Sequence, residues 1–470
     1  MSLCKFPEIN PGSLPLCFAP WFQILIDHSG KIRPCCFDYR AVGNIYKEDI
    51  LTIWNGKPYQ ELRQRLVEGR VGDIPCGYCV YRLTHPTNVY PRFDYGEGER
   101  VINFKRAEYH FLQQDTILTS KPLQYRMDFT YECNLKCKMC YQRNLYTKTR
   151  FPRFFIDEFI DKRYYLHAGE IALVGGEPLV IPESINFMQR LAEIGPGECQ
   201  LLLSTNGLLL DKFWEDIRAF KRVLFAISLD SCDPKTYESI RIRAKWDTIQ
   251  AILDKIEHTI SSEPWRAWKV IFGNLIMKST ITQLPQMLRF GYEHKFANRF
   301  GLIEGPQHTD ENIFVHNWLL DSMPMWKGTL ESSVEIADKF CSDYPTKQNL
   351  MGIRQLLLTK PWVTRSRAYL THRLFGERGL GYIYRDKISR CLSSSAKISM
   401  ASRLLLTIEK SEGRYKDNLF VWLLWSSFAY PMFLTIVSVI SNRYLALAIY
   451  RFLRLSQIIK EKYYYRRMTK

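Results

Sequence analysis

The sequence predicts an α/β protein in which a central parallel sheet or barrel follows a small cysteine-rich domain and precedes a mostly helical, basic and apolar region. Three observations lead to this fold class. Apolar, β-rich runs alternate with helical patterns between residues 122 and 306, cysteines gather in two places, and almost all of the net charge lies near the C-terminus. We therefore expect three regions, at residues 1–100, 101–345 and 346–470.

The composition excludes a disordered chain and a small disulfide-bonded scaffold. Of the 470 residues, 46% are hydrophobic and 14% are aromatic, which is enough for large packed cores. Thirteen cysteines are many, but disulfide scaffolds are much shorter chains. The first residues contain no basic stretch that leads into an apolar run, so we see no secretory signal and expect a cytoplasmic protein with reduced thiols.

The N-terminal region begins with a predicted β-hairpin. Two apolar, β-rich runs flank the turn sequence His28-Ser29-Gly30, and this turn brings Cys17 and Cys35 towards one end. Cys76 and Cys79 follow with C-x2-C spacing. Such a set of cysteines suits either a zinc ion or an iron–sulfur cluster.

This region resembles a SPASM-type iron–sulfur domain. Besides the cysteines, the resemblance rests on Gly43-Asn44-Ile45, Ile53-Trp54-Asn55-Gly56 and Leu62-Arg63. It implies one auxiliary 4Fe-4S cluster, whose four protein ligands are Cys17, Cys35, Cys76 and Cys79. Cys36 is the expected bystander, although the sequence does not decide between Cys35 and Cys36. In the family this domain usually follows the barrel, whereas here it precedes it.

Six strands and several helices are expected in the central region. The strands are Leu123–Thr130, Glu170–Gly176, Gln200–Thr205, Val223–Leu229, Val270–Met277 and Arg299–Glu304. The helical patterns between them include Ile156–Leu166, Pro182–Ile194, Asp211–Phe220 and Thr248–Ile260. In a sheet or barrel of this kind, reactive groups gather at the C-terminal ends of the strands.

A cysteine loop follows directly after the first of these strands. Cys133, Cys137 and Cys140 have the spacing C-x3-C-x2-C. Three thiolates on one short loop can hold a cuboidal iron–sulfur cluster and leave its fourth iron open to another ligand. Taken alone, the spacing also suits a zinc site with a fourth ligand elsewhere, or three unliganded thiols.

The next three strands also end in unusual residues. Gly175-Gly176-Glu177-Pro178 follows the second strand, where paired glycines permit close approach of a ligand and Glu177 can accept hydrogen bonds from an ammonium group. Ser204-Thr205-Asn206-Gly207 follows the third strand. Ser228-Leu229-Asp230 follows the fourth, with Tyr237 and Arg241 on the helix beyond it. Arg241 can grip a carboxylate with two hydrogen bonds, and Asp230 can accept from ribose hydroxyls.

In this order and at these intervals, the motifs resemble those of radical S-adenosylmethionine (SAM) enzymes. The resemblance covers residues 122–306 and implies a partial (β/α)6 barrel with a 4Fe-4S cluster on Cys133, Cys137 and Cys140, whose open iron binds SAM. The implied SAM-binding residues are Gly175, Gly176, Glu177, Pro178, Ser204, Asn206, Ser228, Asp230 and Arg241. By resemblance, Gly175, Gly176 and Glu177 meet the methionine amino group, while Ser228 and Arg241 meet its carboxylate.

Other chemically active side chains carry no prediction of function. Asp128 and Glu132 flank the cysteine loop and suit an acid or base, but exposed carboxylates are common. The remaining cysteines have no partner at ligand spacing and are expected to be small buried apolar residues. They are Cys4, Cys199, Cys232, Cys341 and Cys391.

The C-terminal region carries nearly all of the net charge of +17. Residues 1–350 contain 43 basic and 42 acidic side chains, whereas residues 351–470 contain 22 and 6. The run Leu419–Ser441 has 23 uncharged residues, interrupted by Pro431, and is long enough to span a bilayer. Because a single span would export the basic end, a helical hairpin or helices in the membrane interface suit the positive-inside tendency better. A buried helical pair is the alternative, and nucleic-acid binding is the least favoured.

Together these features predict a cytoplasmic radical SAM enzyme, associated through its tail with the inner face of the membrane. One electron, from a flavodoxin- or ferredoxin-like donor, would cleave SAM to a 5′-deoxyadenosyl radical that abstracts hydrogen from a substrate. The expected substrate is a sugar or lipid-linked glycan, or a peptide or protein side chain. The alternative from a different class is a non-catalytic iron–sulfur relay or binding protein.

Overall fold

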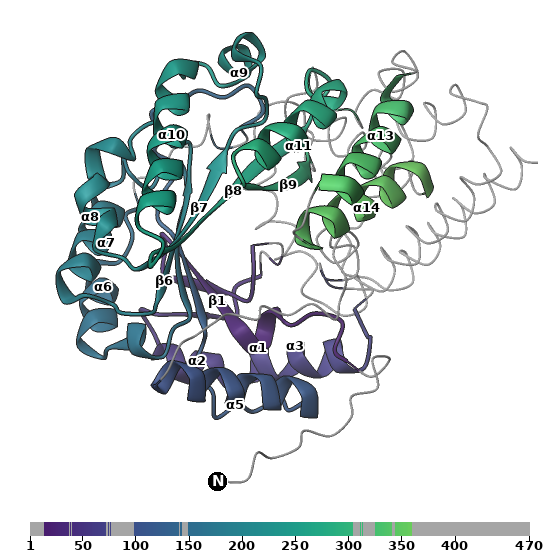
Figure 1. Cartoon of the computed structure of the whole chain (residues 1–470). Helices are drawn as coiled ribbons and strands as arrows, with labels where there is room; N and C mark the ends of the chain where they lie inside the picture. The colour runs from purple at the N-terminus through teal and green to yellow at the C-terminus, as the bar shows by residue number, and fades with distance from the viewer. Residues whose placement is uncertain are drawn as a thin grey trace, which may run out of the picture.

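The computed structural model describes the chain at residues 14–36, 38, 40–71, 74, 76, 98–140, 142, 149–303, 311, 313, 325–340 and 344–359 (Figure 1). The predicted apolar run Leu419–Ser441 lies outside these residues, as do Cys4, Cys79, Cys341 and Cys391. Within the described ranges, no helix combines the length and the apolar character needed to cross a membrane.

A single sheet of nine strands forms the centre of the molecule, in the order β3-β2-β1-β4-β5-β6-β7-β8-β9. The strands from β4 to β9 run parallel, which confirms the predicted α/β class. Each predicted strand of the central region has a counterpart. These are β4 (Gln124–Asp128), β5 (Glu170–Val174), β6 (Gln200–Thr205), β7 (Arg222–Ser228), β8 (Ala267–Ile276) and β9 (Ala297–Leu302).

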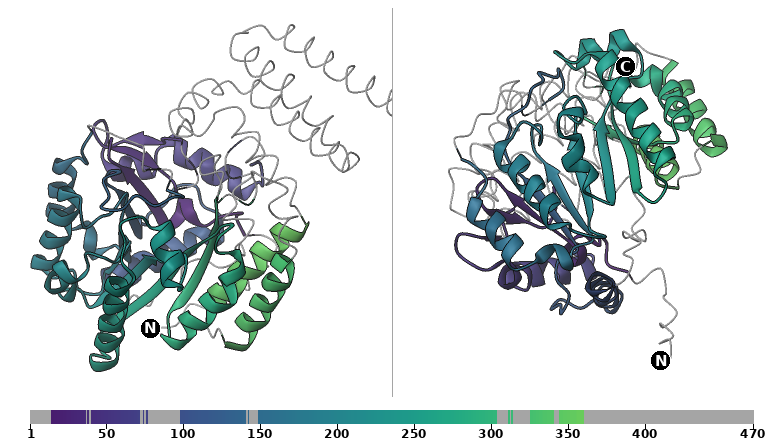
Figure 2. Two further views of the ribbon diagram at one scale, coloured as in Figure 1. Left: turned by 90° about the horizontal axis from the view of Figure 1, so that it is seen from above. Right: turned by 60° about the vertical axis from the view of Figure 1, so that its left-hand side comes forward.

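Helices follow these strands and cover one face of the sheet (Figures 1 and 2). They are α6 (Arg153–Asp161), α7 (Pro182–Ile194), α8 (Trp214–Arg218), α9 (Pro234–Ile240), α10 (Trp246–Ser262) and α11 (Leu284–Glu293), with single 3₁₀ turns η3 (Tyr164–Leu166), η4 (Asp211–Phe213) and η5 (Ile281–Gln283). Helix α7 has the predicted bounds. The predicted helix at 211–220 is η4 followed by α8, and the predicted helix at 156–166 is α6 followed by η3.

The two faces of the sheet differ in burial. Along β7, Val223, Phe225 and Ile227 are fully buried beneath the helices, whereas Leu224 and Ser228 on the other face are half-buried. On the covered face of β4, the ring of Tyr125 meets that of Phe159 in α6 edge-on, with centroids 5.0 Å apart. This alternation follows from the period of two along a strand, and it makes the less covered face the inside of the partial barrel.

The predicted N-terminal hairpin is present, and it extends the barrel sheet. Strands β1 (Gln23–Asp27) and β2 (Lys31–Arg33) pair antiparallel around a turn in which Gly30 has a φ of +73°, and β3 (Gly43–Asn44) pairs with β2. Strand β1 also pairs in parallel with β4, residue for residue from Gln23 with Gln124 to Asp27 with Asp128. No pattern in the sequence predicts this pairing.

Buried Arg63 ties the N-terminal helices to the segment before β4. These helices are α1 (Ala19–Phe22), α2 (Ile50–Trp54), α3 (Lys57–Val67) and α5 (Glu99–Gln113). The guanidinium of Arg63 donates to the carbonyl oxygens of Pro20, Trp54 and Thr116 at 2.8–2.9 Å, and it lies 4.7 Å from the ring centroid of Trp54. The predicted boundary at residue 100 stays a prediction, because the sheet and these contacts run across it.

Helices α13 (Met325–Phe340) and α14 (Tyr344–Thr359) cover the other edge of the sheet, with α14 against β9. Asn349 accepts from the backbone N–H of Phe300 at 2.7 Å and donates to the Phe300 carbonyl at 3.1 Å. The hydroxyl of Thr346 does the same for Asn298. These side chains satisfy edge groups of β9 that would otherwise be free to pair with another strand.

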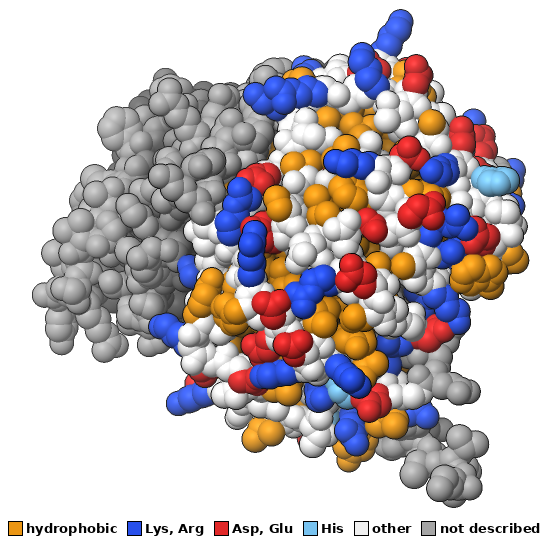
Figure 3. All heavy atoms as spheres, turned by 90° about the vertical axis from the view of Figure 1, so that its left-hand side faces the viewer, with side chains coloured by type: hydrophobic (Ala, Val, Ile, Leu, Met, Phe, Trp, Pro, Cys, Tyr) orange, Lys and Arg blue, Asp and Glu red, His pale blue; other side chains and the backbone are white. Residues whose placement is uncertain are grey.

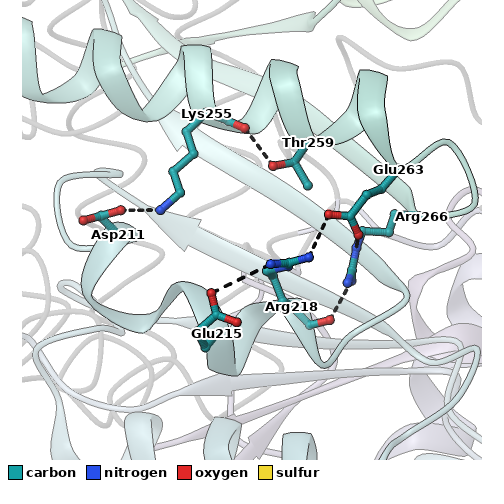
Figure 4. A network of polar contacts seen from close by, with 7 residues as sticks. All are labelled: Asp211, Glu215, Arg218, Lys255, Thr259, Glu263 and Arg266. Atoms are coloured by element: carbon teal, nitrogen blue, oxygen red, sulfur yellow. Dashed lines mark hydrogen bonds and ion pairs between the residues drawn. The ribbon is translucent and has the colours of Figure 1, made fainter.

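The outer face of the helical layer is charged but balanced. Basic and acidic side chains are interspersed over it (Figure 3). Arg218 of α8 contacts Glu263 after α10 at 2.8 Å, and Lys255 of α10 contacts Asp211 at 2.5 Å (Figure 4). These pairs link α10 and the residue after it to η4 and α8. Exposed pairs of this kind each contribute at most about 1 kcal/mol to stability, and they do not indicate a functional site.

Candidate active site

The cysteine loop lies at the C-terminal end of β4, as predicted. Cys133 is exposed, Cys140 is half-buried and Cys137 is buried. Burial raises the pKa of the Cys133 thiol to about 11, and the nearby Cys137 and Cys140 raise it as well. The pKa of Cys137 is raised by burial and by Cys140. The three sulfur atoms therefore lie close enough to interact, and iron would have to displace their protons on binding.

The first wall of the loop is the end of β5. The backbone N–H groups of Gly176 and Glu177 donate to the carbonyls of Thr130 and Glu132 at 2.7 and 2.8 Å. A Cβ on Gly176 would lie 2.1 Å from the Glu132 carbonyl oxygen. The paired glycines therefore leave room for the protein's own cysteine loop, and their predicted contact with the methionine amino group stays a prediction.

The Glu177 carboxylate joins β5 to β6. Its Oε1 accepts from the Thr205 hydroxyl at 2.8 Å and from Leu179 N–H at 3.2 Å, and its Oε2 accepts from Asn206 N–H at 2.7 Å. The side chain is 1% exposed, and burial raises its pKa. Three protein donors therefore hold this carboxylate in place, and its predicted contact with the methionine amino group stays a prediction.

The second wall is the end of β6. The Asn206 side chain donates to the Asn134 side chain at 2.8 Å, and Asn134 lies between the first two cysteines of the loop. The Asn206 oxygen accepts from Leu208 N–H at 3.1 Å. Ser204, in contrast, is half-buried on the inner face of β6. Asn206 thus anchors the loop, while Ser204 faces the interior of the partial barrel.

The third wall is the segment that follows α9. The backbone N–H groups of Lys136 and Lys138 donate to the carbonyls of Ile242 and Ile240 at 3.1 and 2.9 Å. These two bonds set Cys137 opposite Arg241, and the Arg241 Nη1 lies 3.8 Å from the Cys137 sulfur. The loop is therefore fixed by backbone bonds on both sides of its central cysteine.

Arg241 and Asp230 form a buried ion pair beside the loop. Arg241 Nη2 lies 2.6 Å from Asp230 Oδ2, and the two residues are 6% and 2% exposed. Asp230 Oδ1 accepts from Leu275 N–H at 2.7 Å. Burial alone would lower the pKa of Arg241, but Asp230 and Cys137 raise it, so the guanidinium stays charged. Both residues already have protein partners, whereas neighbouring Ser228 is half-buried on the inner face.

A second polar group, which the sequence analysis left undecided, lies where the hairpin meets the barrel. Arg33 of β2 contacts Asp128 at the end of β4 at 3.1 Å and Asp27 at the end of β1 at 3.9 Å. His28 lies 5.1 Å, centroid to centroid, from the ring of Tyr131 in the cysteine loop. Burial raises the pKa of Asp128 and lowers that of His28. Only the β1–β4 pairing brings these residues together, so no local pattern indicates them.

Part of the predicted auxiliary set is close together. Cys17 and Cys36 both raise the pKa of the Cys35 thiol, although enclosure by the protein is the larger cause. Cys35 is also more enclosed than Cys36, whose side chain is exposed. Cys76 is half-buried and packs against the main core, and Cys79 lies outside the described residues. The four-cysteine ligand set stays a prediction.

The donor set of the loop fits an iron–sulfur cluster. It supplies three soft thiol ligands with a guanidinium beside one of them, and thiolates are the ligands that such clusters require. Among the described residues, no three His, Cys, Asp or Glu side chains are arranged to hold a single metal ion. In a cuboidal cluster each cysteine holds a different iron, so the sulfur atoms need not converge on one point.

Comparison with protein families agrees with this geometry. Residues 127–262 match the model of the Radical SAM superfamily, and residues 17–80 match that of SPASM, an iron–sulfur cluster-binding domain. The chain therefore contains a radical SAM domain preceded by a SPASM domain, which confirms both resemblances and the reversed order. These two domains imply iron–sulfur and SAM binding.

Among curated proteins, the chain is similar to GTP 3′,8-cyclases. That of Chlorobaculum tepidum is 25% identical over 233 residues, or 48% of this chain and 63% of that protein. That of Geobacter sulfurreducens is 34% identical over 135 residues, or 28% of this chain and 40% of that protein. The chain thus spans less than two thirds of the length of these relatives.

Among solved structures, the chain is similar to Streptococcus suis SuiB. The crystal structure of SuiB bound to its precursor peptide SuiA shares 13% identity, with a TM-score of 0.34, and covers 69% of this chain and 70% of that one. SuiB bound to S-adenosylmethionine shares 14% identity with a TM-score of 0.31, and covers 62% of each chain.

Proposed function

We propose that this protein is a radical SAM enzyme that reductively cleaves SAM and abstracts hydrogen from a substrate. One arrangement carries the proposal: the ends of β5, β6 and α9 all bond to the loop that bears Cys133, Cys137 and Cys140. A structural zinc site or a set of unliganded thiols would not require the loop to be bonded on three sides. When bound, the cluster supplies a one-electron reductant and an open iron for SAM.

The proposed SAM site divides into two kinds of residue. Ser204 and Ser228 lie half-buried on the inner face of the sheet, where they suit direct contact with SAM, as do the carbonyls of Gly175 and Gly176. The remaining residues, which already bond to protein groups, would hold the loop and the strand ends in place. They are Glu177, Asn206, Asp230 and Arg241, with Pro178 completing the turn.

We further propose a second 4Fe-4S cluster on Cys17, Cys35, Cys76 and Cys79. The match of residues 17–80 to the SPASM model supports it, as does the effect of Cys17 on the pKa of Cys35, which indicates that the two thiols are near each other. Four protein ligands leave no open iron, so this cluster would relay electrons or support the fold. A flavodoxin- or ferredoxin-like protein is the proposed electron donor.

The substrate proposal is a sugar, a lipid-linked glycan or a peptide side chain. The +16 charge of residues 351–470 favours a substrate at an anionic membrane face. GTP is the first compound to test, because the curated relatives bear the name GTP 3′,8-cyclase.

Anaerobic reconstitution tests the function directly. The full chain, loaded with iron and sulfide and reduced with dithionite, should convert SAM to 5′-deoxyadenosine. The variant with Cys133, Cys137 and Cys140 all changed to Ala should lose this conversion and retain about four irons on the auxiliary set. If the wild-type protein holds both clusters and leaves SAM intact, the non-catalytic relay is the better description.

A further inference from the structure

We propose that Arg241 is a positioning residue that fixes a positive charge on the Cys137 side of the radical SAM cluster and thereby raises the reduction potential of that cluster. This proposal rests on one part of the proposed function, namely that Cys133, Cys137 and Cys140 hold a cluster, and it does not depend on SAM cleavage. It differs from the role that the resemblance implies for Arg241, which is contact with the carboxylate of SAM.

The backbone makes the contact between Arg241 and Cys137 independent of any ligand. Two hydrogen bonds, from Lys136 to Ile242 and from Lys138 to Ile240, join the cysteine loop to the chain on each side of Arg241. The second bond also gives the Ile240 carbonyl a partner, because the last carbonyls of a helix accept no hydrogen bond from within the helix. The guanidinium is consequently held at the sulfur by two rigid segments.

Each edge of the guanidinium has a protein partner. Nε donates to the Leu229 carbonyl at 3.3 Å, Nη2 pairs with Asp230 at 2.6 Å, and Nη1 lies 3.8 Å from the Cys137 sulfur. Asp230 is itself held by Leu275 N–H, and its backbone φ of +65° is in the left-handed region that non-glycine residues rarely adopt. Asp230 therefore adopts an uncommon backbone conformation at the position from which its carboxylate orients the Arg241 guanidinium.

The group that faces Cys137 is an N–H of a cationic side chain. Arg241 Nη1 lies 3.8 Å from the sulfur, whereas the Asp230 carboxylate pairs with Nη2, the other terminal nitrogen. A charged donor at this position stabilises added negative charge on the sulfur. A reduced cluster carries one more electron than an oxidised one, so the guanidinium favours reduction.

The neighbour Arg243 provides a matched control. It lies two residues from Arg241 in sequence and carries the same charge, but its side chain is exposed to water. Solvent screens such a charge strongly, so its removal should barely change the field at the cluster. Arg241→Gln and Arg243→Gln therefore differ in burial and contact while removing the same formal charge.

The test is a redox titration of the reconstituted full chain, followed by electron paramagnetic resonance without SAM. Each variant is prepared on a background in which Cys35 is Ala, so that the signal comes from the radical SAM cluster alone. Arg241→Gln should shift the potential to more negative values with unchanged iron content. Arg241→Lys keeps the positive charge, so its potential should be close to that of the parent protein. The potential of Arg243→Gln should equal that of the parent protein.

A separate measurement distinguishes the two roles of Arg241. If Arg241→Lys and Arg241→Gln weaken SAM binding at equilibrium but leave the SAM-free potential unchanged, the proposal is wrong and the SAM-carboxylate role holds. Equal potential shifts in Arg241→Gln and Arg243→Gln would also overturn it. The reduction potential can be measured whether or not the protein cleaves SAM. A protein that shows the expected potential shifts but leaves SAM intact would therefore contradict the enzymatic proposal and not this one. If Arg241→Gln does not load iron, the same titration compares Arg241→Met with Arg243→Met, and only Arg241→Met should make the potential more negative.

Discussion

The two cysteine sites of this chain are built in different ways. The radical SAM loop is one continuous segment that bonds to the ends of β5, β6 and α9, and these bonds come mainly from backbone groups. The auxiliary cysteines are scattered over residues 17–79, where Cys17 and Cys35 approach each other across the hairpin region. Three walls can hold the loop in shape before iron binds, whereas a scattered set depends more on the cluster itself.

This difference matters because the open iron of the proposed cluster would have to receive SAM in one orientation. Catalysis depends on groups that are already positioned when the substrate arrives, and the three walls supply such positioning. A cluster with four protein ligands has no substrate to orient, so a looser ligand set suffices. The following predictions test that contrast.

The largest effect is expected at the auxiliary site. Cys35→Ala removes a half-buried thiol near Cys17 and should lower the iron content by about four atoms per chain. Cys36→Ala removes an exposed thiol and should leave the iron content unchanged. Iron and sulfide assays on the reconstituted proteins measure both. Equal losses would show that Cys36 is a ligand, which sequence alone does not exclude.

The next effect is expected at Glu177. Glu177→Ala leaves three buried donors without an acceptor and should destabilise the protein by about 4 kcal/mol, since each costs about 1–3 kcal/mol. Glu177→Gln keeps an acceptor and should cost less than half as much. Urea unfolding of the iron-free protein gives both values. A mild effect of Glu177→Ala would show that the carboxylate is not the link between β5 and β6.

A similar but smaller loss is expected at the junction of hairpin and barrel. Arg33→Met leaves buried Asp27 and half-buried Asp128 side by side without their cation, which should cost about 3 kcal/mol. Hydrogen exchange should locate the loosening in β1 and β4. The control is Arg33→Met combined with Asp128→Asn, which removes one carboxylate charge and should recover part of the stability. No recovery would mean that the ion pair does not fasten the hairpin.

The smallest effect is expected at Asn134. Asn134→Ala removes one hydrogen bond to Asn206 and should cost about 1 kcal/mol. If the walls hold the loop before iron binds, this variant should also load the radical SAM cluster more slowly while the auxiliary cluster loads normally. The absorbance change during reconstitution follows both. Uniform loading rates would contradict a loop that is fixed in advance.

Much of the fold follows from local sequence patterns. The predicted α7 has its exact bounds, and β6 agrees residue for residue, because their apolar periodicity matches their burial. The parallel pairing of β1 with β4 escaped prediction because these strands are about one hundred residues apart. No periodicity within either strand specifies a neighbour at that distance.

The site was predicted less completely than the fold. The motifs located the strand ends correctly, but they did not separate residues that would touch SAM from residues that bond to the loop. Glu177 and Gly176 are examples, because their partners are Asn206, Thr205 and the Glu132 carbonyl, and these contacts exist only after folding. His28 was predicted only as part of the hairpin turn, and its position beside Tyr131 of the cysteine loop follows from the folded hairpin.

The sharing of one sheet by hairpin and barrel limits how the chain can be shortened. A protein beginning at residue 101 would lose β1 and leave one backbone edge of β4 unpaired, with Tyr125, Met127 and Phe129 beside it. Among the residues that the structure describes, none would cover it as Thr346 and Asn349 cover the opposite edge at β9. An uncovered apolar edge recruits strands from other molecules, so the barrel expressed alone should aggregate. The hairpin therefore acts as a solubility element for the barrel, independently of the metal that its cysteines would bind.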